Sequence, residues 1–154
     1  MAETTVSKVA DYFVCRTRDV GDLITNLKIQ KLAYYAQAWY VARAEARLVD
    51  GEFQAWVHGP VSPELYDRFK VYQANPISED VVEPIFSEPI SEHLAEVFEV
   101  YGAFSGLELE RLTHSERPWI DARGGLPPDA PSNAVIPIQS MAAFYRPLLE
   151  ERDG

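Results

Sequence analysis

The sequence has a single cysteine, Cys15, and no long apolar run. One cysteine excludes an internal disulfide framework and any metal site built from several cysteines. Charged residues or prolines interrupt each apolar stretch before it reaches the roughly 18 residues that a membrane-spanning helix needs. The N-terminus, MAETTVSKVADYF, lacks the basic start and apolar stretch of a secretory signal. We therefore expect a soluble, cytoplasmic protein that does not contact a membrane.

Basic residues are missing from the middle of the chain. Between Val71 and Glu110 there are nine acidic residues and no lysine or arginine, and the net charge of the chain is −10. Such a field repels phosphate backbones, so we expect no nucleic-acid partner. It favours a partner protein that has a basic surface.

Patterns typical of catalysis are missing too. There is no Gly-rich phosphate loop, and His58, His93 and His114 do not stand at metal-ligand spacing from one another. Cys15 and His114 could meet in space as a nucleophile pair. However, Cys15 follows Val14 on an amphipathic segment, which favours a small buried apolar residue. We predict no catalytic residue, no metal and no cofactor. A small cysteine- or histidine-dependent enzyme and a DNA-binding regulator are the alternatives.

What the sequence does contain is enough material for a core. Apolar residues make up 47% of the 154 residues, and a chain of this length buries roughly two thirds of its unfolded surface. The stretch ITNLKIQKLAYYAQAWYVAR, residues 24–43, has no Gly or Pro and is apolar nearly all round. Such a helix is normally central. Thr25 is its expected N-cap, and we expect it to end near Arg47.

Capping residues and periodicity predict the other elements. Residues 52–57 alternate in polarity after a turn at Asp50-Gly51, and predict a strand that ends at 58–60. Residues 77–90 carry two prolines and are expected to form an extended edge strand beside 52–57. Helices are expected from Thr4 or Thr5 to Asp19, Ser62 to Asn75, Ser91 to Phe104, Ser105 to Leu112 and Pro137 to a frayed end at Pro147, with a turn at 118–123.

The predicted fold class is mainly α (α+β). It is a compact bundle of about five to six helices around a central apolar helix, with a small β-hairpin or a two- to three-stranded sheet.

One predicted helix face carries three carboxylates in a row. Glu92, Glu96 and Glu99 stand at i, i+4 and i+7, opposite the apolar side of the helix. Like charges at this spacing weaken a helix by a few tenths of a kcal/mol, and no nearby Lys or Arg relieves them. This stripe is either a solvated face or a docking site for a basic partner.

Two rigid corners are the other candidates for partner binding. The segment WVHGPVSPELY contains His58 and Tyr66, and LTHSERPW contains His114 and Trp119. Loops of this kind often carry function. The alternative is architectural, with Gly for unusual backbone angles, Pro for stiffness and Trp for bulk.

Three ordered segments, ITNLKIQKLAYYAQAWY, AWVHGPVSPELYDRF and LTHSERPWIDAR, resemble the Panacea-domain antitoxins, a family of SocA- and GepA-like proteins. The resemblance runs from about Val6 to Leu149, and departs at His58, where we expect an aromatic residue, usually Tyr, before Gly-Pro.

The resemblance implies a mostly helical fold with a small sheet. It also implies a type II antitoxin that binds and neutralises a protein toxin encoded beside it. In the SocA-like branch it further implies a proteolytic adaptor that delivers the toxin to ClpXP. On this basis residues 1–154 are a single Panacea-like antitoxin domain, whose partners are the cognate toxin and ClpX/ClpP.

Overall fold

The computed structural model describes residues 2–153 and is mainly helical. Two short strands, β1 (Gln54–Trp56) and β2 (Gly59–Val61), form an antiparallel hairpin, and a 3-10 turn, η1 (Lys70–Tyr72), extends α3. The described residues form seven α-helices: α1 (Val6–Asp19), α2 (Asn26–Ala44), α3 (Pro63–Phe69), α4 (Glu88–Tyr101), α5 (Gly106–His114), α6 (Arg117–Ala122) and α7 (Ile138–Asp153). The predicted fold class is confirmed. None of the described helices combines the length and apolar character needed to cross a membrane.

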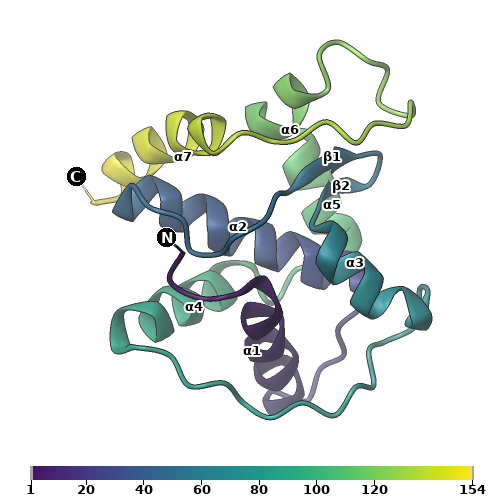
Figure 1. Ribbon diagram of the computed structural model, residues 1–154, viewed down its shortest axis with the longest axis vertical. Coiled ribbons are helices and arrows are strands. Elements are labelled where there is room, and N and C mark those ends of the chain that lie inside the picture. Colours follow the sequence, from purple (N-terminus) through teal and green to yellow (C-terminus); the bar gives the residue numbers. More distant parts are fainter. Residues whose placement is uncertain (1, 154) are drawn as a thin grey trace.

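The helix α2 runs through the middle of the molecule, as predicted. It lies between α7 on one side and α1 and α4 on the other, and the hairpin and α3 lie beyond its N-terminal end (Figure 1). Every side chain from Lys28 to Ala38 is buried. The Thr25 hydroxyl accepts a hydrogen bond from the Lys28 N–H at 3.2 Å, which confirms the N-cap. The helix ends at Ala44 rather than near Arg47, because Glu45 adopts a left-handed conformation with φ 56°.

The aromatic side chains of α2 are buried to different degrees. Trp39 is only half-buried, and its indole N–H donates to the Tyr101 hydroxyl at 2.7 Å. Tyr34 and Tyr35 are the largest fully buried side chains of the helix. The largest buried rings of α2 therefore lie near the middle of the helix.

The predicted sheet partner was wrong. The strand expected over 52–57 pairs with Gly59–Val61 instead of 77–90, in the register Gln54↔Val61 and Trp56↔Gly59. The His58-Gly59-Pro60 sequence does not end the sheet, because Gly59 takes φ 105° and turns the chain back on itself. The far edge of β1 is covered by 134–136, where the Ala55 N–H donates to the Ala134 carbonyl at 2.8 Å.

Several predicted helix ends also need correction. Helix α4 starts at Glu88 with Pro89 in its first turn, not at Ser91, and it stops at Tyr101, which leaves Phe104 exposed. The Ser105–Glu108 capping box of α5 is confirmed, and the turn expected at 118–123 is the short helix α6.

Helix α7 does not fray at Pro147. It continues to Asp153, because the buried side chains of Tyr145 and Leu149, on either side of the proline, hold the helix to the core.

Candidate functional site

A groove of about 640 Å³ opens at the hairpin end of α2. Its floor is formed by Asn26, Gln30 and Lys31 of α2, and its walls include Trp56 on β1, Tyr66 on α3 and Leu107 on α5. These six residues define the hairpin groove. Its volume lies in the range of natural ligand and anchor-residue sites. Because four elements meet here, the groove exists only in the folded chain.

Gly59 sets the position of the hairpin above α2. A Cβ at this position would lie 2.6 Å from Cε of Lys31 and 2.9 Å from Oγ1 of Thr113. The backbone also needs φ 105° here, a conformation that residues with a side chain rarely adopt. Only glycine satisfies both requirements, so the hairpin packs directly on the Lys31 side chain.

Lys31 is a buried cation at the floor of the groove. Its side chain is 0% exposed, and Nζ donates to the Pro60 carbonyl at 3.2 Å. Burial lowers the pKa of Lys31 to about 7, and the negative charge of Glu110 partly opposes this shift. Burial therefore favours the neutral form of the Lys31 amine.

The other two floor residues tie α2 to the start of α3. The Gln30 amide donates to the Asn26 side-chain oxygen at 3.0 Å, and the Ser62 N–H donates to the Gln30 oxygen at 2.9 Å. Ser62 is also the N-cap of α3, accepting from the Leu65 N–H. The wall residue Tyr66, one turn into α3, is thereby positioned by the floor.

The rim of the groove combines aromatic and ionisable side chains. The rings of Trp56 and Tyr66 lie 4.9 Å apart, and Leu107 is 50% exposed on the facing wall. Nδ1 of His58 lies 3.3 Å from the Glu110 carboxylate, which makes an ion pair when the imidazole is protonated. His58 and Tyr66, both predicted from the first corner, therefore lie in one site.

The second corner supports the first from behind. His114 and Trp119 stack with ring centroids 3.9 Å apart, and the Trp119 indole N–H donates to the Trp56 carbonyl at 2.8 Å. Trp119 is only 5% exposed, and the guanidinium of Arg123 lies over its ring at 4.8 Å while donating to the Ala55 carbonyl at 2.9 Å. His114 and Trp119 do not line the groove; they hold its hairpin in place.

Comparison with known proteins places this architecture in a family. The sequence matches the family described as "Antitoxin SocA-like, Panacea domain" over residues 29–120. The chain belongs to this family. A relative, the Antitoxin SocA of Caulobacter vibrioides (strain NA1000 / CB15N), is 33% identical over 109 residues, which cover 62% of this chain and 58% of the relative. The matched part thus spans less than two thirds of that relative. No solved structure matches the chain.

The glutamate stripe of this Panacea-domain protein lies away from the groove. Helix α4, which carries Glu92, Glu96 and Glu99, packs on the opposite side of the molecule from α3 and the hairpin (Figure 1). Glu92 and Glu99 are exposed, but Glu96 pairs with Arg43 of α2 at 3.3 Å. The acidic segment itself contains no cation, and Arg43 of α2 supplies one from outside it.

Sequence reasoning missed the polar floor. Lys31, Gln30 and Asn26 lie on a helix that is otherwise apolar, and their burial is apparent only when the hairpin is placed over them. The sequence did contain one sign of this floor. The two lysines of KIQK, residues 28–31, lie in a part of α2 that has no solvated face to carry them.

Glu116 was also missed. Its carboxylate accepts hydrogen bonds from the hydroxyls of Tyr35 at 2.8 Å and Tyr145 at 2.7 Å. Burial raises the pKa of Glu116, and these two hydrogen bonds partly oppose the shift. Together with Tyr34 and Tyr101, these residues form a buried tyrosine cluster between α2, α4, α6 and α7. It joins these helices through ring contacts and hydroxyl hydrogen bonds.

The structure does not assemble a Cys15/His114 pair. Cys15 is fully buried on α1, where its Sγ lies 3.4 Å from Nη2 of Arg18, and burial raises the pKa of the thiol. His114 instead stacks on Trp119, which is bonded to the hairpin. Within residues 2–153, no group of three His, Cys, Asp or Glu side chains is placed to hold a metal ion.

Proposed function

We propose that this protein is a type II antitoxin that binds and neutralises the protein toxin encoded beside it, with residues 1–154 acting as one domain in the cytoplasm. Membership of an antitoxin family supports the role. One continuous cluster of buried apolar residues, from Val6 to Tyr145, supports a single domain. The observation that carries the proposal is the hairpin groove, an open and largely apolar depression at one end of the central helix.

The groove has the chemistry of a protein-binding hot spot. Trp and Tyr dominate the energetics of such sites, because they offer large apolar area at a small entropic cost. Trp56 and Tyr66 stand side by side on one wall, and Leu107 presents an exposed aliphatic surface on the other. We infer that an apolar side chain of the toxin enters between these walls and displaces water from them.

The negative charge of the chain indicates which kind of toxin surface fits the groove. Glu110 lies in the wall beside His58, and the chain as a whole carries a net charge of −10. A basic toxin surface gains association rate and specificity from this field. Glu92, Glu96 and Glu99 belong to the proposal as steering charges outside the contact. His114 and Trp119 belong to it as supports of the hairpin.

Delivery of the bound toxin to ClpXP is a second, separable part of the proposal. It rests on the resemblance to SocA-like proteins alone. Neutralisation by occlusion needs only the complex, whereas an adaptor speeds toxin degradation. ClpXP, ATP and the toxin, incubated with and without this protein, separate the two modes by the lifetime of the toxin.

The test of the groove uses two matched substitutions of exposed leucines. Leu107→Arg places a charge on the groove wall, and Leu148→Arg places the same charge on α7, where Leu148 is also partly exposed. We expect Leu107→Arg to weaken binding of the toxin from the adjacent reading frame by about 30-fold or more, the effect of losing one hot-spot contact. Leu148→Arg should bind as wild type does. If the wild-type chain neither binds that toxin nor restores growth when co-expressed with it, the proposed function is wrong.

A further inference from the structure

Residues 77–87 form an extended strap that crosses the outer face of α1 between η1 and α4 (Figure 1). Three apolar side chains, Ile77, Val81 and Phe86, attach the strap to the core, and the Phe86 ring meets the ring of Tyr12 edge-on at 6.2 Å. The strap starts with a hydrogen bond from the Ile77 N–H to the Ile24 carbonyl at 2.8 Å. These side chains and this hydrogen bond hold the strap against the core.

The backbone of the strap is unpaired. Within residues 2–153, no N–H or carbonyl from 78 to 86 makes a hydrogen bond to another backbone group. Among the described residues, the thiol of Cys15, 3.8 Å from the Val81 carbonyl, is the one side-chain hydrogen-bonding partner of this backbone. An extended segment with free N–H and carbonyl groups is a template for pairing with another strand. The sequence predicted an edge strand here, and the described residues supply no backbone partner for it.

Two apolar side chains on either side of Pro84 face outward, so the strict alternation of a regular strand is broken at this proline. Val82 is 88% exposed and Ile85 is 94% exposed, the two highest values among the large apolar residues described. Both are β-branched, a side-chain type that packs well between paired strands. Solvated apolar side chains standing on an unpaired, extended backbone indicate a surface that another protein covers.

A second cavity lies at the start of the strap. It measures about 350 Å³ and opens between Ile77–Asp80 and the end of α1, with Leu23 exposed at its rim. Thr17 lines this cavity, is 1% exposed, and its hydroxyl has no hydrogen-bond partner among the described residues. The cavity therefore has room for a side chain of a partner protein. It also contains a hydroxyl group that has no hydrogen-bond partner among the described residues.

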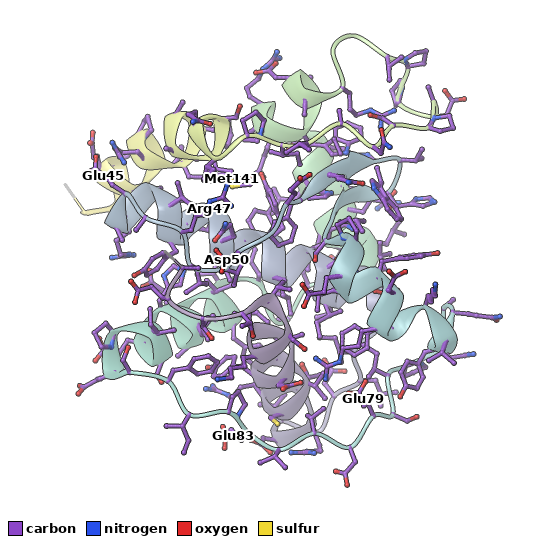
Figure 2. The ribbon with its side chains drawn as sticks, in the orientation of Figure 1. Glu45, Arg47, Asp50, Glu79, Glu83 and Met141 are labelled. Carbon is purple, nitrogen blue, oxygen red and sulfur yellow. The ribbon has the colours of Figure 1, made fainter. Side chains whose placement is uncertain are left out.

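Charge identifies the partner. Glu79 is bound by Arg68, with Nη2 of the arginine 2.7 Å from the carboxylate, but Asp80 and Glu83 form no ion pair with any described residue. Figure 2 shows Glu79 and Glu83 along the margin of the molecule that the strap forms. Arg18 is the only cation that lines the adjacent cavity. The strap is therefore a negatively charged edge, which complements a basic strand.

We propose that the strap is a docking strand on which the toxin forms an intermolecular β-ladder. An exposed basic strand of the toxin pairs with the backbone of residues 78–86. Its side chains cover Val82 and Ile85, and one apolar side chain enters the cavity beside Leu23. Backbone pairing supplies affinity, and the side chains on both faces supply specificity. This inference rests on the proposed antitoxin function and adds a second contact surface to the hairpin groove.

Amide hydrogen exchange tests the ladder directly. The probe is the protein encoded by the adjacent reading frame, added to the full chain at saturating concentration. Amides of 78–86, apart from Pro84, which has none, should exchange rapidly in the free chain. In the complex, we expect alternate amides to slow by about tenfold or more, because the amides of a strand point to its two edges in turn. A complex that forms without slowing any of these amides overturns the docking strand.

Paired proline substitutions separate backbone pairing from side-chain contact. Val82→Pro and Glu83→Pro each remove one N–H, and these two N–H groups point to opposite edges of an extended strand. Val82→Ala and Glu83→Ala shorten the same side chains and keep both donors. We expect one proline variant to bind the toxin about tenfold or more weakly than its alanine counterpart, with the other pair equal. Equal binding within both pairs overturns the ladder.

The outcome is distinguishable from failure of the antitoxin function. If wild type binds the toxin, Leu107→Arg weakens binding and the strap variants do not, the groove is the contact and the docking strand is wrong. If wild type binds no adjacent-frame toxin, the function itself is wrong. Folding of each variant is checked by circular dichroism, and the strap substitutions are exposed, so we expect native spectra throughout.

Discussion

The N-terminal and C-terminal parts of α2 bury side chains of different chemistry. The first half, from Asn26 to Lys31, places polar groups under the hairpin groove, and the second half, from Leu32 to Ala44, places aromatic rings against α4 and α7. At the groove end, the ammonium of Lys31 has a single hydrogen bond, to Pro60. At the other end, the hydroxyl of Tyr35 is bound to Glu116 and its ring is stacked on a neighbour.

This difference indicates which end of α2 stabilises the fold and which end is suited to binding. A desolvated lysine with one hydrogen-bond acceptor reduces the free energy of unfolding at the groove end. The tyrosine cluster has rings in contact and bonded hydroxyls, which stabilise the opposite end. We interpret the groove end as the part that keeps unfavourable features for binding, while the cluster keeps the helix in place.

The largest effect is expected at the tyrosine cluster. Tyr35→Ala removes a fully buried ring stacked on Tyr101 at 4.0 Å and leaves Glu116 with one hydroxyl partner fewer. We expect the free energy of unfolding to fall by about 3–5 kcal/mol. Tyr35→Phe keeps the ring, so it should lose only about 1–3 kcal/mol. Urea denaturation measures both losses. If the alanine variant and wild type have the same midpoint of urea unfolding, the tyrosine cluster does not stabilise the fold.

The buried cation is expected to give the next largest effect, and one that depends on pH. Burial lowers the pKa of Lys31 from 10.5 to about 7. Between these values the unfolded chain binds one proton more than the folded chain, so this group makes the free energy of unfolding rise with pH. Lys31→Met removes the contribution. The variant should be most favoured relative to wild type below pH 7, and should lose that advantage, on the order of a few kcal/mol, as pH rises from about 7 to 10.5.

Urea denaturation at several pH values measures the Lys31 effect. Lys8→Met is the matched control, because Lys8 is exposed on α1. The two methionine variants should differ in their pH dependence. Parallel curves for the two variants would show that Lys31 is charged and solvated in the folded chain.

Gly59 packs on Lys31 at the groove end, and its replacement should have an intermediate effect on the free energy of unfolding. The added methyl group of Gly59→Ala meets Lys31, and the backbone is strained as well, so we expect a loss of about 1–3 kcal/mol. Gly51→Ala is the control, since Gly51 also has a positive φ but has open space around it. The Lys31→Ala background should relieve part of the Gly59→Ala loss. Additive effects of the two substitutions would mean that the contact with Lys31 is not the cause.

The smallest effect on stability is expected at the glutamate stripe, outside both halves of α2. Changing Glu92, Glu96 and Glu99 together to Lys should alter the free energy of unfolding by only a few tenths of a kcal/mol. Association with the toxin should slow and lose its salt dependence, because a steering field is reversed. Stopped-flow kinetics at several salt concentrations measures this. Unchanged association rates would assign the stripe to solvated surface.

Local signals predicted the elements well. The N-cap of α2 at Thr25, the Ser62-Pro63 start of α3 and the Ser105–Glu108 capping box each depend on residues within one turn of one another. Within the site, His58 and Tyr66 could be predicted for the same reason, because they share one short segment around a rigid corner.

The pairing of β1, the Arg43–Glu96 ion pair and the Lys31–Pro60 hydrogen bond could not be predicted. Each joins segments whose approach depends on the packing of the whole chain.

The sequence by itself determined the helices, the central place of α2 and the negative charge of the middle segment, because caps, periodicity and charge are properties of neighbouring residues. Only the tertiary structure decided which polar groups are buried. Lys31 has a lowered pKa because the hairpin covers it, and the strap is an unpaired strand because the 134–136 segment and β2 occupy both edges of β1. Burial and pairing depend on contacts between distant segments, and no local pattern of residues encodes them.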